Sequence, residues 1–223
     1  MNSVARSVRT LACYWGGHRS VIKSKKQQNR LLPLIYSSLF VFAGLSACTS
    51  QRPVPVNRYY HLPAPAKPAE KRKAVLKALV INRPEAYGIY NERAILYTSK
   101  SRPREVNRYH YHLWARVPAL LVQESFITYF RESGLAGKVF SSDQTNHADG
   151  VININLLRFE QVVTDHGSRA LVRVEISYRR GSQERTRTYE AQTPAPNQSI
   201  YAVTTALGSS LDKILHRFVK DNF

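Results

Sequence analysis

The chain has 223 residues and a formal net charge of +18 at neutral pH. That length allows one domain or two, and the basic excess permits nucleic acid, anionic lipid headgroups or acidic protein surfaces as partners without choosing among them. Only two cysteines occur, Cys13 and Cys48, and the first lies in a segment that reads as a cleaved leader, so a disulfide-stapled scaffold is excluded.

An export signal is predicted over residues 1–47. Seven positive charges and no acidic residue lie there, which leaves a formal net charge of +11 for residues 48–223. The basic stretch 23–30 precedes an uncharged apolar run over 31–47. This order is typical of a signal peptide, and the run is shorter than the roughly 20 apolar residues of a membrane-spanning helix. Residues 1–20 exceed what such a leader needs, so an over-extended gene start stays open.

The leader ends in Leu45-Ser46-Ala47-Cys48, which resembles the lipobox of bacterial lipoproteins. The small residues let the chain lie extended in a peptidase cleft, and the Cys48 thiol is the nucleophile that takes the diacylglyceryl group. Several acyl chains make a firm anchor, because a single chain binds membranes only marginally. Thr49 stands where an aspartate commonly signals inner-membrane retention, so the resemblance implies the outer membrane, with the protein facing the periplasm.

The mature chain is predicted to have two parts. Residues 48–73 combine the lipidated cysteine with a proline-rich tether, which is stiff and extended, and residues 74–223 form a single domain. Within the tether, residues 58–62 are an apolar island, which either packs locally or forms an edge strand.

The domain is predicted to be α+β: a mainly antiparallel or mixed sheet flanked by two amphipathic helices. One helix starts at Pro118 and ends at Gly134, and the other starts after an N-cap at Ser199, beyond a break at Pro194 and Pro196. At about 150 residues such a domain can bury a proper core. Strands are predicted over residues 74–81, 94–98, 104–116, 138–140, 151–163, 170–178 and 186–192.

Two of these strands carry irregularities. Residues 104–116 alternate strictly, which predicts a strand with one buried face. Trp114 is in phase with the polar His110 and His112, yet we expect it in the core, so this strand must twist or bulge before the helix. The alternation of the long strand blurs at residues 156–157, which predicts a bulge or bend there.

No residue pattern predicts an enzyme, a cofactor or a metal site. His110 and His112 share a strand face and can chelate zinc or copper. Structural zinc, however, requires four ligands, and no cysteine is free to complete the set. A polar, exposed strand face is therefore the favoured interpretation of the two histidines. A nucleophile elbow, a phosphate-binding glycine loop and an HExxH motif are absent from the sequence, and Asp143, Asp149 and Asp165 lie in turn-rich contexts.

Arginines and tyrosines mix on the 104–116 strand, at Arg108, Tyr109, Tyr111 and Arg116. Such a mixture suits single-stranded nucleic acid through stacking and phosphate pairing, but the predicted compartment argues against that ligand. A solvated basic face with aromatic rings beneath it is the favoured interpretation, and these four positions are the candidates for docking a protein partner.

Three segments resemble the ABC-type transport auxiliary lipoproteins, the PqiC-like family. They are residues 58–62 (RYYHL) just past the cysteine, residues 109–118 with Trp114-Ala115, and the pair Ala148-Asp149 before a strand reaching Arg158-Phe159-Glu160. Their order and spacing match across residues 58–223. Arg116 departs from the family, which often carries an acidic residue there.

The resemblance implies a non-catalytic accessory subunit without cofactors. Its partners would be an MCE-type periplasmic protein and inner-membrane transporter subunits, in a system that moves lipids between the two membranes and supports envelope integrity. Self-association into a homo-oligomer stays open. Two rivals remain: a lipoprotein regulator of cell-wall synthesis, and a lipid-binding lipoprotein that acts alone.

Overall fold

The computed structural model describes residues 54–68, 73–141 and 148–223. The predicted leader with its lipobox (Leu45, Ser46, Ala47), the lipidation site Cys48 and the sorting position Thr49 lie outside these ranges, so they remain predictions. Within the described ranges, no helix combines the length and the apolar character needed to cross a membrane.

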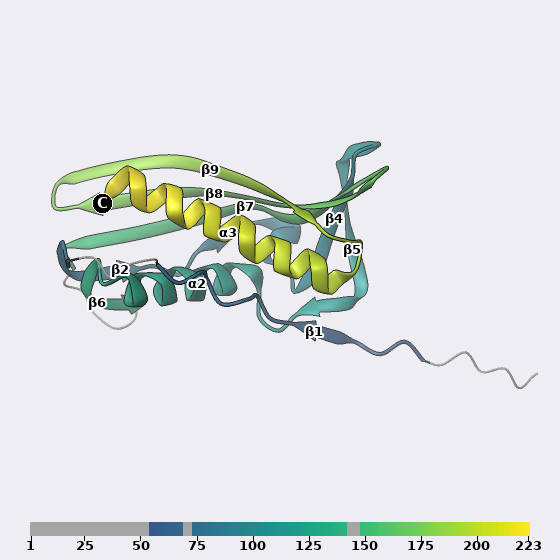
Figure 1. Ribbon diagram of the computed structural model, residues 1–223, viewed down its shortest axis with the longest axis horizontal. Helices are drawn as coiled ribbons and strands as arrows, with labels where there is room; N and C mark the ends of the chain where they lie inside the picture. The colour runs from purple at the N-terminus through teal and green to yellow at the C-terminus, as the bar shows by residue number, and fades with distance from the viewer. Residues whose placement is uncertain (1–53, 69–72, 142–147) are drawn as a thin grey trace, which may run out of the picture. The chain divides into compact units, whose positions relative to one another are not determined.

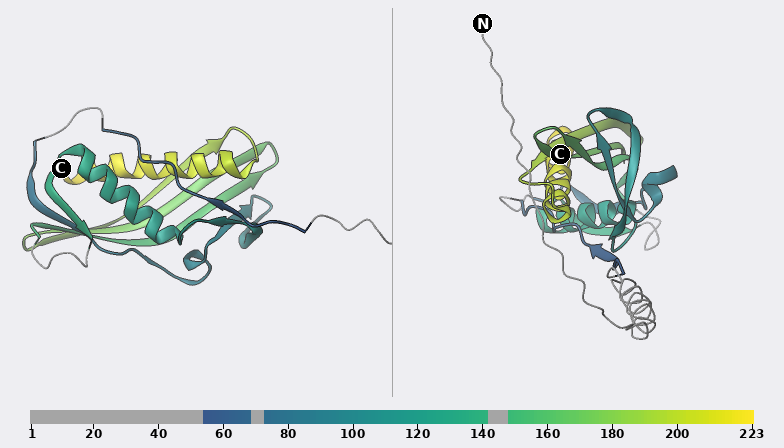
Figure 2. Two further views of the ribbon diagram at one scale, coloured as in Figure 1. Left: turned by 90° about the horizontal axis from the view of Figure 1, so that it is seen from below. Right: turned by 90° about the vertical axis from the view of Figure 1, so that its right-hand side faces the viewer.

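A nine-stranded mixed sheet curls around two α-helices (Figures 1 and 2). The α+β class and the two flanking helices are therefore confirmed, and the sheet is mixed. Among the described residues, the helical elements are the 3-10 helix η2 (Gly88–Asn91), α2 (Pro118–Ser133) and α3 (Ile200–Asn222). The strands are β1 (Arg58–Tyr60), β2 (Leu76–Ile81), β3 (Glu85–Ala86), β4 (Ala94–Ser99), β5 (Arg102–Trp114), β6 (Ala136–Ser141), β7 (Gly150–Thr164), β8 (Gly167–Arg180) and β9 (Gln183–Ala195).

The long strand β7 organises the sheet. One of its edges pairs with β8, which in turn pairs with β9, both antiparallel. Its other edge is shared by three parallel strands in succession: β2 at residues 150–152, β3 at 155–156 and β4 at 160–163. Beyond them, β6 pairs with β2, while β5 and then β1 extend the sheet from β4. The sheet therefore has two branches on one side of β7.

Helix α2 begins and ends, and helix α3 begins, where the local sequence predicts. Pro118 occupies the first turn of α2, and Gly134 ends this helix in the left-handed conformation at a φ of 70°, which costs glycine no steric penalty. The side chain of Ser199 caps α3 by accepting a hydrogen bond from the Ala202 amide at 3.2 Å. Each helix turns an apolar stripe toward the sheet, as the 3.6-residue period requires.

Aromatic rings fill the space between the helices and the sheet. Phe126 and Phe130 of α2 meet Phe218 of α3 at centroid distances of 6.2 and 6.3 Å. Phe218 also meets Tyr178 of β8 and Tyr189 of β9, each at 6.0 Å. These tilted and edge-to-face arrangements are those that aromatic pairs prefer, so the helices and the sheet are joined through their aromatic rings.

Both expected bulges are present. Ala94 of β4 pairs with Leu113 of β5, and the next pair joins Leu96 to Arg108. Between these two pairs β5 has more residues than β4, which makes the bulge. This irregularity separates buried Trp114 from exposed His110, as we expected. The second register shift lies between Leu156 and Arg158 on β7.

Two expectations about strands were wrong. Pro194 does not end the strand, because β9 continues through it to Ala195. The strand tolerates this proline because β9 pairs only with β8, and the N–H that proline lacks would point away from β8. The strand 104–116 does not bury one whole face, since only Trp114 is fully buried. The bulge interrupts the alternation on which that expectation rested. Neither β3 nor η2 was predicted from the sequence.

Candidate functional site

The N-terminal segment is an integral part of the domain surface. β1 pairs parallel with β5, setting Tyr59 beside Leu113 and Tyr60 beside Trp114. The Ala115 amide donates to the Tyr60 carbonyl at 2.8 Å, and the Tyr60 hydroxyl lies 2.8 Å from Nδ1 of His112. Of the two alternatives left open for residues 58–62, the edge strand is observed at Arg58–Tyr60, and Leu62 packs against the core.

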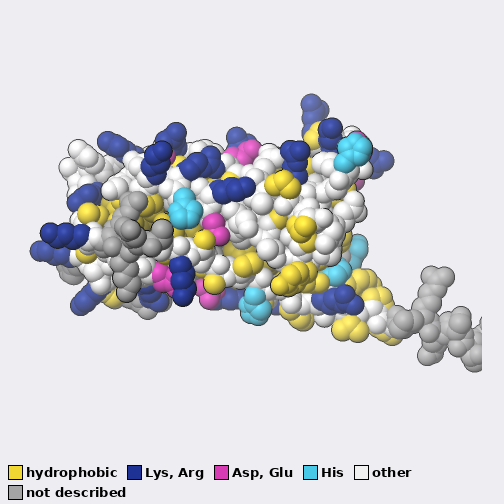
Figure 3. All heavy atoms as spheres, in the orientation of Figure 1, with side chains coloured by type: hydrophobic (Ala, Val, Ile, Leu, Met, Phe, Trp, Pro, Cys, Tyr) yellow, Lys and Arg dark blue, Asp and Glu magenta, His cyan; other side chains and the backbone are white. Residues whose placement is uncertain are grey.

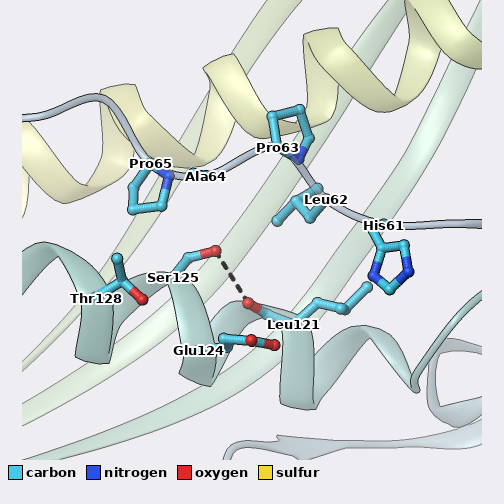
Figure 4. A pocket seen from close by; sticks show the side chains of 9 residues that line it. All are labelled: His61, Leu62, Pro63, Ala64, Pro65, Leu121, Glu124, Ser125 and Thr128. Carbon is cyan, nitrogen blue, oxygen red and sulfur yellow. Dashed lines mark hydrogen bonds between the residues drawn. The ribbon is translucent and has the colours of Figure 1, made fainter.

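Beyond β1, the chain crosses both helices (Figure 4). Pro63 lies against Gly208 of α3, where an added Cβ would come within 3.1 Å of Pro63 Cδ. The Ala66 amide donates to Oδ1 of Asp212 at 3.1 Å, and burial raises the pKa of that carboxyl despite this hydrogen bond. A hollow of about 190 Å³ remains between residues 61–65 and α2. The proline-rich segment is thus docked on the helices over this stretch.

Two of the four predicted docking residues are arginines engaged in ion pairs. Arg108 lies 2.9 Å from Glu92, and Arg116 lies 3.4 Å from Glu124, in the second turn of α2. All four side chains are 45–61% exposed, and exposed pairs of this kind contribute little to stability. Both arginines therefore stay accessible to a partner, at the cost of releasing a neighbouring glutamate.

The two predicted docking tyrosines have different environments. Tyr109 stacks on Tyr97 at 4.6 Å, and its hydroxyl donates to Oε1 of buried Gln161 at 2.8 Å. Burial raises the pKa of Tyr109. Tyr111 is 46% exposed, so it is the tyrosine of the two that presents its ring to solvent.

A second exposed aromatic lies close to Tyr111 in the sheet. Tyr59 is 55% exposed, and the Arg93 guanidinium lies 5.2 Å from its ring centroid, a cation–π contact. Tyr59 is in register with Leu113, two residues beyond Tyr111, so the two tyrosines belong to one region of β1 and β5. We call Tyr59, Arg93 and Tyr111 the β1–β5 patch.

The histidine pair on β5 does not form a metal centre in the described part of the chain. His110 is exposed, whereas His112 contacts Tyr60. Burial, and to a lesser degree the positive charge of Arg58, lowers the pKa of His112. Among the described residues, no three His, Cys, Asp or Glu side chains converge as metal ligands would.

A buried carboxylate that the sequence analysis overlooked lies on β7. Glu160 is fully buried and forms an ion pair with Arg158. It also accepts hydrogen bonds from the Tyr90 hydroxyl at 2.6 Å and from the Thr98 hydroxyl at 3.3 Å. These contacts fasten η2 to the sheet, and they satisfy the carboxylate as burial requires. The spacing of Arg158 and Glu160, two apart on a strand, could have indicated this pair.

Tyr90→Phe is expected to lower the free energy of unfolding by about 1.5 kcal/mol, the low end for a hydrogen bond to a charged group, because the ring is only part-buried. Burial and the Glu160 carboxylate raise the pKa of Tyr90 to about 12. Because the folded-state pKa exceeds the unfolded value of 10.0, the contribution is complete below about pH 10 and lost as pH rises toward 12. Urea unfolding of both proteins at neutral pH checks the first claim, and their converging stabilities at alkaline pH check the second. Equal stability at neutral pH would contradict both.

The end of the domain opposite β1 is strongly basic. The β8–β9 turn lies at that end (Figures 1 and 2), and Lys and Arg side chains gather there (Figure 3). Arg187 pairs with Asp221 at 2.7 Å, and Arg180 donates to the Val75 carbonyl at 3.1 Å. Within the described residues, neither Arg179 nor Arg185 has a carboxylate at ion-pair distance. We call Arg179, Arg180, Arg185 and Arg187 the distal basic end.

Comparisons with known proteins identify one family and one fold. The model of the ABC-type transport auxiliary lipoprotein component family matches residues 60–217. A crystal structure of a Xanthomonas campestris protein, assigned to family DUF330, superposes with a TM-score of 0.64 at 20% identity, covering 73% of this chain and 92% of that one. A crystal structure of an uncharacterized protein gives 0.60 at 12% identity, covering 74% and 98%. No curated protein matches the chain. At these identities the solved structures establish the fold alone.

Proposed function

The chain belongs to the family of ABC-type transport auxiliary lipoprotein components, and from this premise we propose that it is the outer-membrane, non-catalytic subunit of an MCE-type system that moves lipids between membranes. The family match over residues 60–217 is the observation that carries the proposal. The lipobox at Cys48, outside the described residues, supports the anchoring half of it. In this role the protein would hold a periplasmic partner close to the outer membrane.

The arrangement of the domain suits such a role. Arg58, at the start of β1, is ten positions beyond Cys48, and an extended chain of that length spans at most roughly 35 Å. The β1 end would therefore stay near the membrane, while the distal basic end would point away from it. A partner reaching across from the inner membrane would meet the distal basic end first.

A pull-down with the full chain as bait tests the assignment. We expect MCE-type and transporter subunits among the captured proteins. Capture of peptidoglycan synthases in their place would favour a regulator of cell-wall synthesis. Co-purified lipid without a protein partner would favour a stand-alone lipid carrier.

Association with the MCE partner is expected to slow as salt rises, while dissociation changes little. Electrostatic complementarity chiefly speeds encounter, and exposed charges are screened over about 8 Å at physiological salt. Surface plasmon resonance across a salt series measures both rates. The double variant Arg179→Gln and Arg185→Gln should lose most of the salt dependence. Arg108→Gln with Arg116→Gln removes the same charge nearer β1 and is the matched control. A wild-type association rate indifferent to salt would leave the β1–β5 patch and Tyr109 as the next candidates.

Thr49→Asp is expected to move the protein from the outer to the inner membrane, because it creates the retention signal that Thr49 lacks. Sucrose-gradient fractionation of cell envelopes measures the distribution, with Thr49→Ser as the control that should stay in place. If the aspartate variant also stays in the outer membrane, the sorting rule does not govern this protein.

A further inference from the structure

Strand β9 is the outer strand of the β7–β8–β9 meander, and its two edges differ. One edge pairs with β8 from Gln183 to Ala195 in an unbroken register. Within the described residues, no strand pairs with the other edge. Since the N–H and C=O groups of successive residues in a strand point to alternate sides, every second residue directs its backbone polar groups toward this outer edge.

Contacts from α3 identify which residues these are. Nζ of Lys213 donates to the Gln192 carbonyl at 3.1 Å, and Arg217 donates to the Glu190 carbonyl. The even-numbered residues of β9 therefore face away from β8. Pro194 fits this parity, because a proline is tolerated where the strand needs no N–H.

The outer edge is closed over one half of β9 and open over the other. Lys213, Arg217 and Pro194 close the half from Glu190 onward. At Glu184, Thr186 and Thr188 the backbone N–H and C=O groups of the outer edge have no hydrogen-bond partner among the described residues. All residues from 183 to 188 are exposed, so a further strand has free access to five consecutive positions.

The charge around the open half selects its occupant. Arg185 and Arg187 of the distal basic end lie within this stretch, and Arg179 is in register with Glu184, the one acidic residue of the stretch. Charged edge strands usually discourage pairing, but arginines repel only basic strands. A second copy is disfavoured as well, because antiparallel pairing about Thr186 would set Arg185 of one copy opposite Arg187 of the other, and like charges opposite one another destabilise a sheet.

We propose that residues 184–188 of β9 are a docking edge that takes up an acidic, extended segment of a partner protein as an additional strand of the sheet. Backbone hydrogen bonds would supply the affinity and the arginines the selectivity, as in other cases of strand addition. The identity of the partner that supplies this strand rests on the proposed function, in which a transport partner docks at the distal basic end. The test below uses no transport protein, so failure of the inference can be told from failure of the proposed function.

The probe is a short fluorescent peptide of alternating glutamate and valine, titrated into the full chain in neutral detergent and followed by fluorescence anisotropy. We expect it to bind, and we expect the lysine–valine peptide not to. A glutamate–valine peptide N-methylated at alternate residues keeps the charge but loses one row of strand hydrogen bonds, so it should not bind either. If the acidic peptide does not bind, or if its N-methylated form binds equally well, the proposal is wrong.

The decisive variant is Thr186→Pro, with Thr186→Val as its matched control. Both variants lose the hydroxyl contact with Ser177, which is 2.6 Å, but only proline removes the outward N–H, and it leaves the pairing with β8 intact. We expect Thr186→Pro to weaken peptide binding about tenfold or more, a loss of about 1.4 kcal/mol, and Thr186→Val to leave it unchanged. Wild-type affinity in Thr186→Pro would overturn the proposal in favour of adhesion by charge alone.

Two further measurements keep the proposal falsifiable if Thr186→Pro does not fold. Arg185→Glu should weaken binding of the acidic peptide and admit the lysine–valine peptide, and no change in preference would overturn the role of the arginines. Sedimentation of the wild-type chain should show no self-association through this edge. Dimers that Arg185→Glu strengthens would assign the edge to a second copy and would also overturn the proposal.

Discussion

Trp114→Ala is expected to lower the free energy of unfolding by about 3–5 kcal/mol, the usual cost of truncating a large buried aromatic side chain. Trp114 is 1% exposed, and its ring packs against Phe159 at 5.4 Å. Its amide also donates to the Arg93 carbonyl at 2.6 Å, and Tyr60 of β1 lies beside it in register. Loss of the ring would leave a cavity where β1, β5 and β7 converge.

Thermal and urea unfolding of the wild type and the variant measure this loss. Tyr111→Ala is the matched control, because Tyr111 lies on the same strand but is 46% exposed, and its removal should change stability little. An unchanged melting temperature together with lost partner binding would reassign Trp114 from the core to a binding site.

Cys48→Ser is expected to abolish lipidation completely and to leave the uncleaved precursor. The diacylglyceryl group is transferred to the cysteine sulfur, and a serine hydroxyl is too weak a nucleophile to replace the thiolate. Without acyl chains the firm anchor disappears. Incorporation of radiolabelled palmitate, compared between wild type and variant, measures the effect.

Cys13→Ser is the control, because that cysteine lies within the predicted leader and should not affect labelling. Equal incorporation in wild type and Cys48→Ser would remove the lipoprotein assignment of Cys48. The domain would then lack the anchor on which the proposed orientation of its distal basic end depends.

Local features of the chain were predictable from the sequence because their causes are local. Helix α2 begins at Pro118 and ends at Gly134, and Ser199 caps α3. These boundaries depend on backbone geometry and hydrogen bonds that involve only neighbouring residues. The doublet at residues 156–157 disrupts an alternation that can be read directly, and a bulge follows there. The family resemblance likewise follows from order and spacing, and the match over residues 60–217 confirms it.

Tertiary structure alone decided which residues are available for docking. Tyr109 and Tyr111 look equivalent in the sequence, but the bulge in β5 and the stacking on Tyr97 bury much of the first and leave the second exposed. Glu160 becomes a buried charge because Tyr90 and Thr98, both more than 60 residues away, converge on it. Such pairings depend on how distant strands align, which periodicity does not encode.

The open edge of β9 shows the same limit most clearly. Alternation predicts a strand near residues 186–192, but whether that strand is central or outermost depends on the pairing of the whole sheet. Lys213 and Arg217 close one half of the edge only because α3 packs alongside β9. The sequence by itself determined the leader prediction, the helices and most strands, since these follow from local chemistry and period. The docking edge, the buried carboxylate and the separation of the distal basic end from β1 arise from contacts between distant segments, so only the folded chain reveals them.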